Sequence, residues 1–255
     1  EMLRAHITVP HAQGCVVRLC DRRGCTLPAS LADAAVCRGS FHAVLGGEAG
    51  EAVFADFSAA LQKAQAEGRI LTASLFRYEN HLFFYAEGLN RPFTPQGLCP
   101  ALDAALLPWP PALGEAAPRP WAAMQPYFYH DVPTTAADWQ QGRCPQRRRG
   151  RIALLPPDSW CSYMEHHLRI VTEGLVEGDR WHLICVQEGV LFSYLEEPRT
   201  NVNIRHQPGA HSPELDAWIA ADPESHFARF TPEQKAHPDS GHNFVFLPRI
   251  AGTED

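Results

Sequence analysis

The sequence contains one structural unit twice, and this repetition constrains the fold more strongly than any other feature of the chain. The segment "EGRILTASLFRYENHLFFYAEGL" begins at Glu67, and "EGDRWHLICVQEGVLFSYLEEP" begins at Glu177, 110 residues later. Each segment has Glu-Gly, an alternating strand, a tight turn and a second strand that ends in LFFYAE or LFSYLE. Alternating strands joined by a tight turn are typical of β-hairpins. We therefore expect the chain to form the same hairpin twice.

Further elements flank the two hairpins in the same order. A helical pattern of apolar residues precedes each hairpin, over residues 53–64 and 160–171, and a short apolar strand ("SFHAVL" and "RIALLP") precedes each helix. A second helix ("ALDAALLPW" and "ELDAWIAAD") and an aromatic strand ("MQPYFYH" and "HNFVFLPRI") follow each hairpin. The order strand, helix, strand, strand, helix, strand is that of the ferredoxin-like fold.

The predicted fold class is α+β, with two tandem ferredoxin-like repeats. A four-stranded sheet of this kind has helices on one face and a bare opposite face, so two such sheets would bury their bare faces together. The result would be a pseudo-dimeric α/β barrel within one chain. The predicted division is an N-terminal hairpin-like extension with cysteines (1–38), a degenerate first repeat (39–132), a basic linker (133–149) and a second repeat that carries the site (150–255).

Composition narrows the range of partners. The net charge of −7 offers no electrostatic footprint for a polyanion, so we expect no nucleic-acid partner, and the basic run "RCPQRRRGR" (143–151) is interpreted as a solvated linker. No secretion signal is recognised at the start of the chain, and no apolar run approaches the roughly 20 residues that span a bilayer. We expect a cytoplasmic protein with no membrane partner. The eight cysteines lack the paired spacing of metal sites, so structural thiols and no metal are expected.

The helix of the second unit carries two polar rings on the side that should face the core. In "SYMEHHLRIVTEG", Tyr163 and His167 are one helical turn apart and fall on the apolar stripe. The two rings could simply satisfy each other, or the backbone, within a crowded core. The first unit has Val53 and Phe57 at the matching positions, so packing alone does not require polar groups there. This difference favours a functional site in the C-terminal half.

The second unit resembles the L-rhamnose mutarotase family, whose members are small dimeric ferredoxin-like proteins. The motif "YMEHHLRIVTE" places Tyr163, His167 and Glu173 at the intervals found in that family. Trp181 matches an aromatic strand position, and the strand "VLFSYLEE" contains Tyr194 at the position of a family tyrosine. The resemblance covers roughly residues 151–250 and extends to the first unit only in outline.

The resemblance implies an isomerase, a mutarotase or epimerase that opens a sugar ring by acid–base catalysis. His167 would move the protons, and Tyr163 would orient its imidazole or donate to a sugar oxygen. The implied substrate-binding residues are Trp181, Tyr194, Glu173, Phe227 and His226. The implied partner is a sugar, with no cofactor, bound by a monomer whose repeat imitates a dimer or by a weak homodimer.

Two other kinds of function stay open. The same barrel could form a cofactor-free monooxygenase, or a protein that binds haem or another small ligand, because one fold hosts many chemistries. A non-catalytic binding module is the third possibility, and the degenerate first unit is compatible with it.

Overall fold

The computed structural model describes residues 6–7, 17–18, 31–112, 114–173, 176–199, 205–206, 209, 211–235 and 240–253. These residues form a mixed α+β fold that contains two antiparallel five-stranded sheets. The α+β class and the two sheets with helices on their outer faces agree with the prediction from the sequence. The cysteine-containing hairpin predicted within residues 1–38 lies outside the described residues, apart from the short paired strands β1 (His6–Ile7) and β2 (Val17–Arg18).

The first sheet has the strand order β14-β4-β5-β3-β6. Its strands are β3 (Val36–Val44), β4 (Ile70–Tyr78), β5 (His81–Leu89), β6 (Ala122–Ala123) and β14 (Arg249–Gly252). The second sheet has the order β13-β8-β11-β10-β7. Its strands are β7 (Gln125–Tyr129), β8 (Arg147–Leu154), β10 (Leu183–Gln187), β11 (Val190–Glu197) and β13 (Val245–Leu247). Both predicted hairpins are present, as β4–β5 and β10–β11.

Each half of the chain gives one edge strand to the sheet of the other half. The chain leaves the first sheet after β6, and β7 then pairs with β10 of the second sheet. The C-terminal segment does the reverse, because β13 pairs with β8 and β14 pairs with β4. The aromatic strand "MQPYFYH" therefore belongs to the second sheet, although the sequence places it at the end of the first unit.

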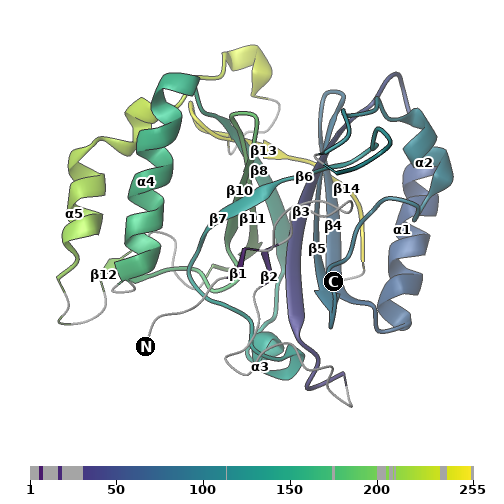
Figure 1. The fold of residues 1–255 in the computed structure, drawn as a ribbon, viewed down its shortest axis with the longest axis horizontal. Coiled ribbons are helices and arrows are strands. Elements are labelled where there is room, and N and C mark those ends of the chain that lie inside the picture. The colour runs from purple at the N-terminus through teal and green to yellow at the C-terminus, as the bar shows by residue number, and fades with distance from the viewer. Residues whose placement is uncertain are drawn as a thin grey trace.

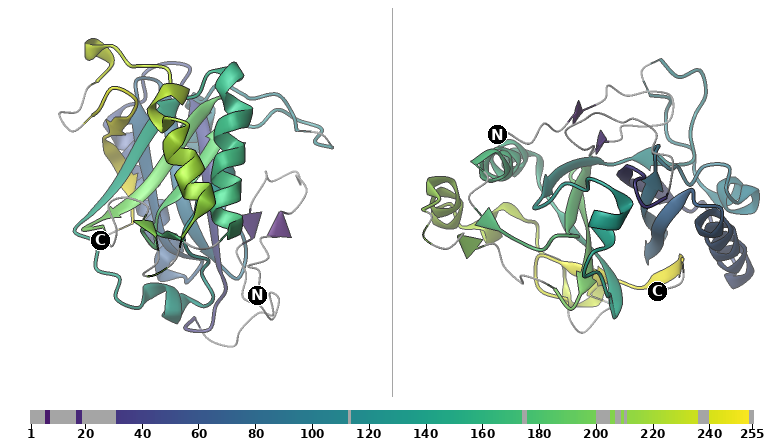
Figure 2. Two further views of the ribbon diagram at one scale, coloured as in Figure 1. Left: turned by 90° about the vertical axis from the view of Figure 1, so that its left-hand side faces the viewer. Right: turned by 90° about the horizontal axis from the view of Figure 1, so that it is seen from below.

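The molecule has four layers, with one sheet against the other in the middle and helices on both outer faces (Figures 1 and 2). Helices α1 (Glu51–Ala66) and α2 (Pro100–Ala105) cover the first sheet, while α4 (Pro157–Glu173) and α5 (Pro213–Ala220) cover the second. The remaining elements are short: α3 (Ala136–Gln140), β9 (Val176–Glu177), β12 (Arg205–His206), and the 3-10 turns η1 (Pro223–His226) and η2 (Pro232–Gln234).

Strand alternation divides the apolar residues between a core under each helix pair and a core between the sheets. In β5, Phe84 faces α1, and its neighbours Phe83 and Tyr85 face the second sheet. Phe83 stacks on Phe192 with 5.4 Å between ring centroids, and Tyr85 stacks on Tyr194 at 3.7 Å. Because both faces of these strands are covered, β5 and β11 are apolar on both sides.

Three arginine side chains of the basic segment that was interpreted as a solvated linker are instead buried in ion pairs. Arg143 lies between the two halves, 2.7 Å from Glu87 of β5 and 2.6 Å from Glu196 of β11. Arg148 and Arg149, whose side chains are each 8% exposed, belong to β8 and pair with carboxylates of β11. The charges of this run neutralise acidic residues within the fold, which composition alone does not reveal.

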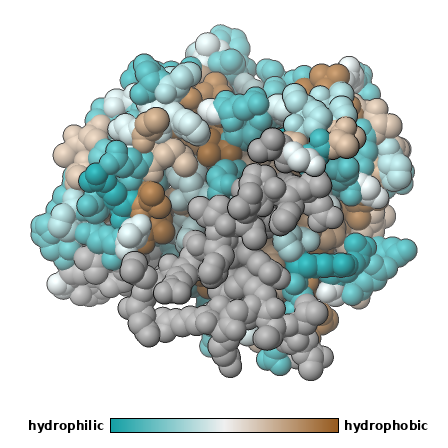
Figure 3. Space-filling model, viewed as in Figure 1, coloured by the Kyte–Doolittle hydropathy of each residue, from teal (hydrophilic) through white to brown (hydrophobic). Residues whose placement is uncertain are grey.

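Within the part of the chain that the structure describes, no helix has both the length and the apolar character needed to cross a membrane. Hydrophilic residues predominate over the described part of the face drawn in Figure 3, with hydrophobic residues in small groups between them.

Candidate functional site

Helix α4 turns Tyr163 and His167 toward the second sheet, as the sequence predicts. The two side chains are 2% and 4% exposed, and their ring centroids are 4.2 Å apart. The buried face continues with Ile170, whereas two other apolar residues of the predicted helical pattern, Trp160 and Leu168, are 43% and 62% exposed. The buried face is therefore narrow and follows the i, i+4, i+7 positions.

The protonation of His167 follows from its hydrogen bond. Its Nδ1 lies 2.9 Å from the backbone oxygen of Tyr163, one turn earlier in the helix. A carbonyl oxygen only accepts hydrogen bonds, so in the neutral ring Nδ1 carries the proton. The lone pair of Nε2 is then free to accept a proton from a bound molecule.

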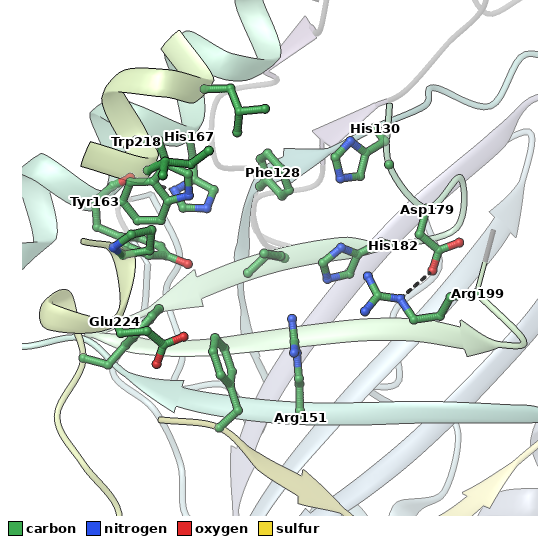
Figure 4. A pocket seen from close by; sticks show the side chains of 17 residues that line it. Phe128, His130, Arg151, Tyr163, His167, Asp179, His182, Arg199, Trp218 and Glu224 are labelled. Atoms are coloured by element: carbon green, nitrogen blue, oxygen red, sulfur yellow. Dashed lines mark hydrogen bonds and ion pairs between the residues drawn. The ribbon is translucent and has the colours of Figure 1, made fainter. Parts of the chain in front are cut away.

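A cavity of about 440 Å³ opens beside these two rings, between helices α4 and α5 and the outer face of the second sheet (Figure 4). Its apolar walls include five aromatic side chains: Phe128, Tyr163, Trp218, Phe227 and Phe244. Its polar lining consists of His130, Arg151, His167, Asp179, His182, Arg199 and Glu224. A concave site with aromatic walls and a few convergent polar groups is typical of small-molecule binding.

The three histidines of the cavity are held neutral. Burial lowers the pKa of His167 to about 4, against a weaker opposing effect of its bond to the Tyr163 carbonyl. Burial likewise lowers the pKa of His130 to about 4 and that of His182 well below its usual value. At neutral pH these rings are therefore bases and hydrogen-bonding groups, and they carry no charge.

The fold brings His130 into the cavity from the first half of the chain. The ring follows β7, the strand that crosses to the second sheet, and it lies against the backbone of Gly178. A Cβ at Gly178 would overlap this ring, so the glycine allows the imidazole to enter the cavity wall.

Among the described residues, no group of three or more His, Cys, Asp and Glu side chains could hold a metal ion. The arrangement that the cavity does provide is a neutral imidazole base, aromatic walls, and two guanidinium groups from Arg151 and Arg199.

The structure brings only part of the predicted site together. His167, Tyr163 and Phe227 line the cavity. His226 is buried at the edge of this group, with its ring 6.0 Å from that of Tyr163 and its Nε2 3.3 Å from the hydroxyl of Ser162.

The other predicted residues lie elsewhere. Trp181 is 7% exposed and donates from Nε1 to the backbone oxygen of Trp139 at 3.1 Å. Tyr194 is in the core between the sheets and donates to Glu196. Glu173, at the end of α4, accepts a hydrogen bond from Ser212.

Sequence reasoning missed Arg151, Arg199, Asp179, His130 and Trp218. For Arg151 a signal was present. Strand pairing sets it opposite Ser193, whereas the corresponding positions of the first sheet hold Phe41 opposite Phe84. An arginine in place of a core phenylalanine marks an unusual environment. No comparable signal exists for Arg199 or His130, because loops and the strand exchange bring them to the cavity.

No protein-family model matches the sequence, and no curated protein matches it. Two crystal structures are similar. A "putative monooxygenase" from Lactobacillus acidophilus NCFM has a TM-score of 0.39 and 6% identity, over 85% of this chain and 95% of that chain. A "Putative monooxygenase" from Fusobacterium nucleatum subsp. nucleatum ATCC 25586 has a TM-score of 0.36 and 7% identity, over 86% of this chain and 94% of that chain. At these TM-scores the names alone assign no activity to this chain.

The prediction of a sugar mutarotase or epimerase is wrong. The physical reason lies in the geometry of the site. Of the five residues predicted to bind the sugar, only Phe227 lines the cavity beside His167. Trp181 and Tyr194 are packed in other parts of the core and cannot stack on a sugar ring bound there.

Proposed function

We propose that the chain is a cofactor-independent monooxygenase that deprotonates an aromatic small molecule in the cavity beside His167 and lets the resulting anion react with dioxygen. The observation that carries the proposal is a neutral imidazole whose Nε2 lone pair borders an aromatic-walled cavity of about 440 Å³. A volume of that order suits a molecule of two or three fused rings.

The proposal includes an architecture of two tandem ferredoxin-like repeats with exchanged edge strands. The strand order of each sheet supports it. Four strands of each sheet have the same order when they are numbered within their own half of the chain. These are β6-β3-β5-β4 in the first sheet and β13-β8-β11-β10 in the second. Since one chain supplies both sheets of the barrel, we propose that it acts as a monomer on a small-molecule partner.

The base in this mechanism is His167. Its Nε2 takes a proton from an acidic C–H of the substrate, and the bond from Nδ1 to the Tyr163 carbonyl stabilises the imidazolium that forms. The aromatic walls orient the substrate and exclude water, so the anion is poorly solvated and its electrons are available to dioxygen.

The steps balance without an external reductant, because the substrate supplies the electrons. A CH₂ group between two aromatic rings loses a proton to His167, and the carbanion forms a C–O bond with O₂. The imidazolium returns the proton to give a hydroperoxide. Removal of the second C–H proton by the same base then expels the terminal oxygen as water and leaves C=O, so CH₂ and O₂ become C=O and H₂O.

Anthrone tests the proposal, since oxidation of its CH₂ group gives anthraquinone. The purified protein is incubated with anthrone and ¹⁸O₂ at pH 6–7, and the rate without protein is subtracted. We expect one ¹⁸O in anthraquinone, and we expect His167→Gln to lower the rate by about 100-fold or more. The matched control is His166→Gln, on the same helix but outside the cavity, which should retain the rate.

The pH profile gives a second test. The activity should be constant between pH 8 and pH 6 and should fall as the pH drops toward the pKa of His167, about 4, where the base becomes protonated. Saturable binding of anthrone without protein-dependent oxygen uptake would overturn the proposal and identify a ligand-binding protein.

A further inference from the structure

Among the described residues, no carboxylate lies within ion-pair distance of Arg151, which lines the cavity. Arg151 forms no ion pair or hydrogen bond with the residues that the structure describes, and its Nε is fully buried. Its guanidinium carbon lies 4.3 Å from the ring centroid of Phe244, an orientation that fixes the group without neutralising it. Burial lowers the pKa of Arg151 to about 10, so the group is still charged at neutral pH.

The other charges of the cavity are already matched or solvated. Arg199 lies 3.4 Å from Asp179, which gives a neutral pair. The carboxylate of Glu224 is at the exposed rim and accepts a hydrogen bond from the amide of Asn243, and its charge opposes the effect of burial on the pKa of Arg151 only in part. A buried charge without a partner is costly, because desolvation is not repaid by a nearby opposite charge.

Arg149 shows how the fold treats an equivalent arginine with no role in the cavity. It stands two residues earlier on the same face of β8 and lies over Phe246 at 4.0 Å, much as Arg151 lies over Phe244. Unlike Arg151, it has the carboxylate of Glu197 at 3.2 Å. The protein thus places a carboxylate at ion-pair distance from Arg149, whereas in the described part of the chain none lies that close to Arg151.

Folding does not require a charge at this position. The strand register matches Arg151 and Ser193 with Phe41 and Phe84 of the first sheet, where two buried rings fill the space. An apolar pair therefore satisfies the same framework.

A second unsatisfied group lies at the same end of the cavity. Nε2 of His182 is buried and has no hydrogen-bond partner in the described part of the chain. Figure 4 shows Arg151 of β8 and His182, just before β10, both directed into the cavity. A neutral imidazole can donate one N–H, so this nitrogen and the guanidinium can bind a single anionic group together.

We propose that the ligand of this cavity is an aromatic carboxylic acid, whose carboxylate pairs with Arg151 and accepts a hydrogen bond from His182 Nε2. Its ring system lies between Phe128, Trp218 and Phe244, which brings the remainder of the molecule to His167. This inference rests on the proposed function for the reaction that follows binding, and it adds the substrate class. Arg151 is the residue that selects an anionic substrate.

The test compares two ligands of nearly the same size and shape, 2-naphthoate and 2-naphthamide, by isothermal titration calorimetry; only the first is charged. We expect the wild-type protein to bind the carboxylate at least about 10-fold more tightly than the amide, which is the usual scale for a charge-assisted pair. Arg151→Met should remove this preference, and Arg151→Lys should retain part of it. Arg149→Met is the matched control and should leave the ratio unchanged.

Equal affinities for the two ligands, a preference that survives Arg151→Met, or no saturable binding of either ligand would overturn the inference. Its failure can be distinguished from that of the proposed function. A carboxylate preference without oxygen uptake leaves the anion site intact and removes the oxygenase, whereas oxygen uptake with no charge preference does the reverse. His167→Gln should abolish turnover and preserve the binding ratio.

Discussion

The two helix–sheet layers of this molecule have the same strand order beneath their helices, but one encloses an apolar core and the other a cavity with polar side chains. Under α1, Phe57 is 1% exposed, and its ring lies 5.7 Å from that of Phe84 and 6.3 Å from that of Trp121. Under α4, the matching helix position holds His167, which borders a cavity of about 440 Å³. The first layer is closed with hydrocarbon, whereas the second is open and lined with imidazole and guanidinium groups.

This difference separates what the fold needs from what the site needs. Since the first layer is stable with rings at positions 41, 57 and 84, polar groups at the matching positions of the second layer do not serve packing. They cost stability through burial, and a bound ligand would offset that cost. Polar residues that stand where a repeat has apolar ones are therefore candidates for function.

The largest expected loss of stability follows from removing the buried ion pairs that join the two layers. Arg143 is buried between Glu87 and Glu196, which also accept hydrogen bonds from Tyr85 and Tyr194. Although burial favours the protonated acid, the charge of Arg143 holds the pKa of Glu87 below its usual value. Arg143→Met would remove the ion pair of Glu87 and leave Glu196 with Arg148 alone, so we expect the free energy of unfolding to fall by about 5 kcal/mol in urea titrations at pH 7.

Arg147→Met is the matched control for this substitution. Arg147 is in the same basic segment, but its side chain is 58% exposed and lies 4.0 Å from Glu197. We expect a loss below about 1 kcal/mol. Equal losses in the two variants would mean that the buried cluster does not hold the halves together.

The parts of this fold that the sequence predicts are those encoded locally. The strands of both hairpins follow from alternation, and the inward direction of Tyr163 and His167 follows from helical periodicity. The repeat also carries information that goes further: aligning its strands would have set Arg151 against Phe41 and identified the cavity arginine.

The remainder depends on contacts between distant segments. The aromatic pattern of "MQPYFYH" predicts β7 but not the sheet that it joins, because either sheet offers an edge strand to pair with. Trp181 was predicted in the site from a resemblance in spacing alone, yet it packs against Trp139 of α3, in a segment interpreted as a linker. Motif spacing specifies which residues are present and leaves open which surface they contact.

The next prediction concerns the closed layer. Phe57→Ala removes a fully buried ring from between Phe84 and Trp121, and we expect the free energy of unfolding to fall by about 4 kcal/mol. Leu168→Ala, on the exposed side of α4, should cost little, because its side chain is 62% exposed. If Phe57→Ala cost no more than Leu168→Ala, the first layer would not be the closed core that distinguishes it from the second.

The smallest expected change in stability comes from replacing His167 of the open layer with phenylalanine, the residue that the closed layer has at the matching position, Phe57. In wild type, the pKa of His167 is about 4 in the folded protein and about 6.5 when unfolded, so between these values only the unfolded chain takes up the proton. Stability attributable to His167 is therefore complete above pH 6.5 and is lost as the pH falls toward 4.

The free energy of unfolding of His167→Phe should be within about 1 kcal/mol of the wild-type value at pH 7, because a cavity borders the position and admits the larger ring. On going from pH 7 to pH 5 the variant should lose about 2 kcal/mol less than wild type in urea titrations. His130 keeps its lowered pKa in both proteins, so acid sensitivity is reduced and not abolished. An identical pH dependence in the two proteins would show that folding does not lower the pKa of His167, which would contradict the burial effect described above.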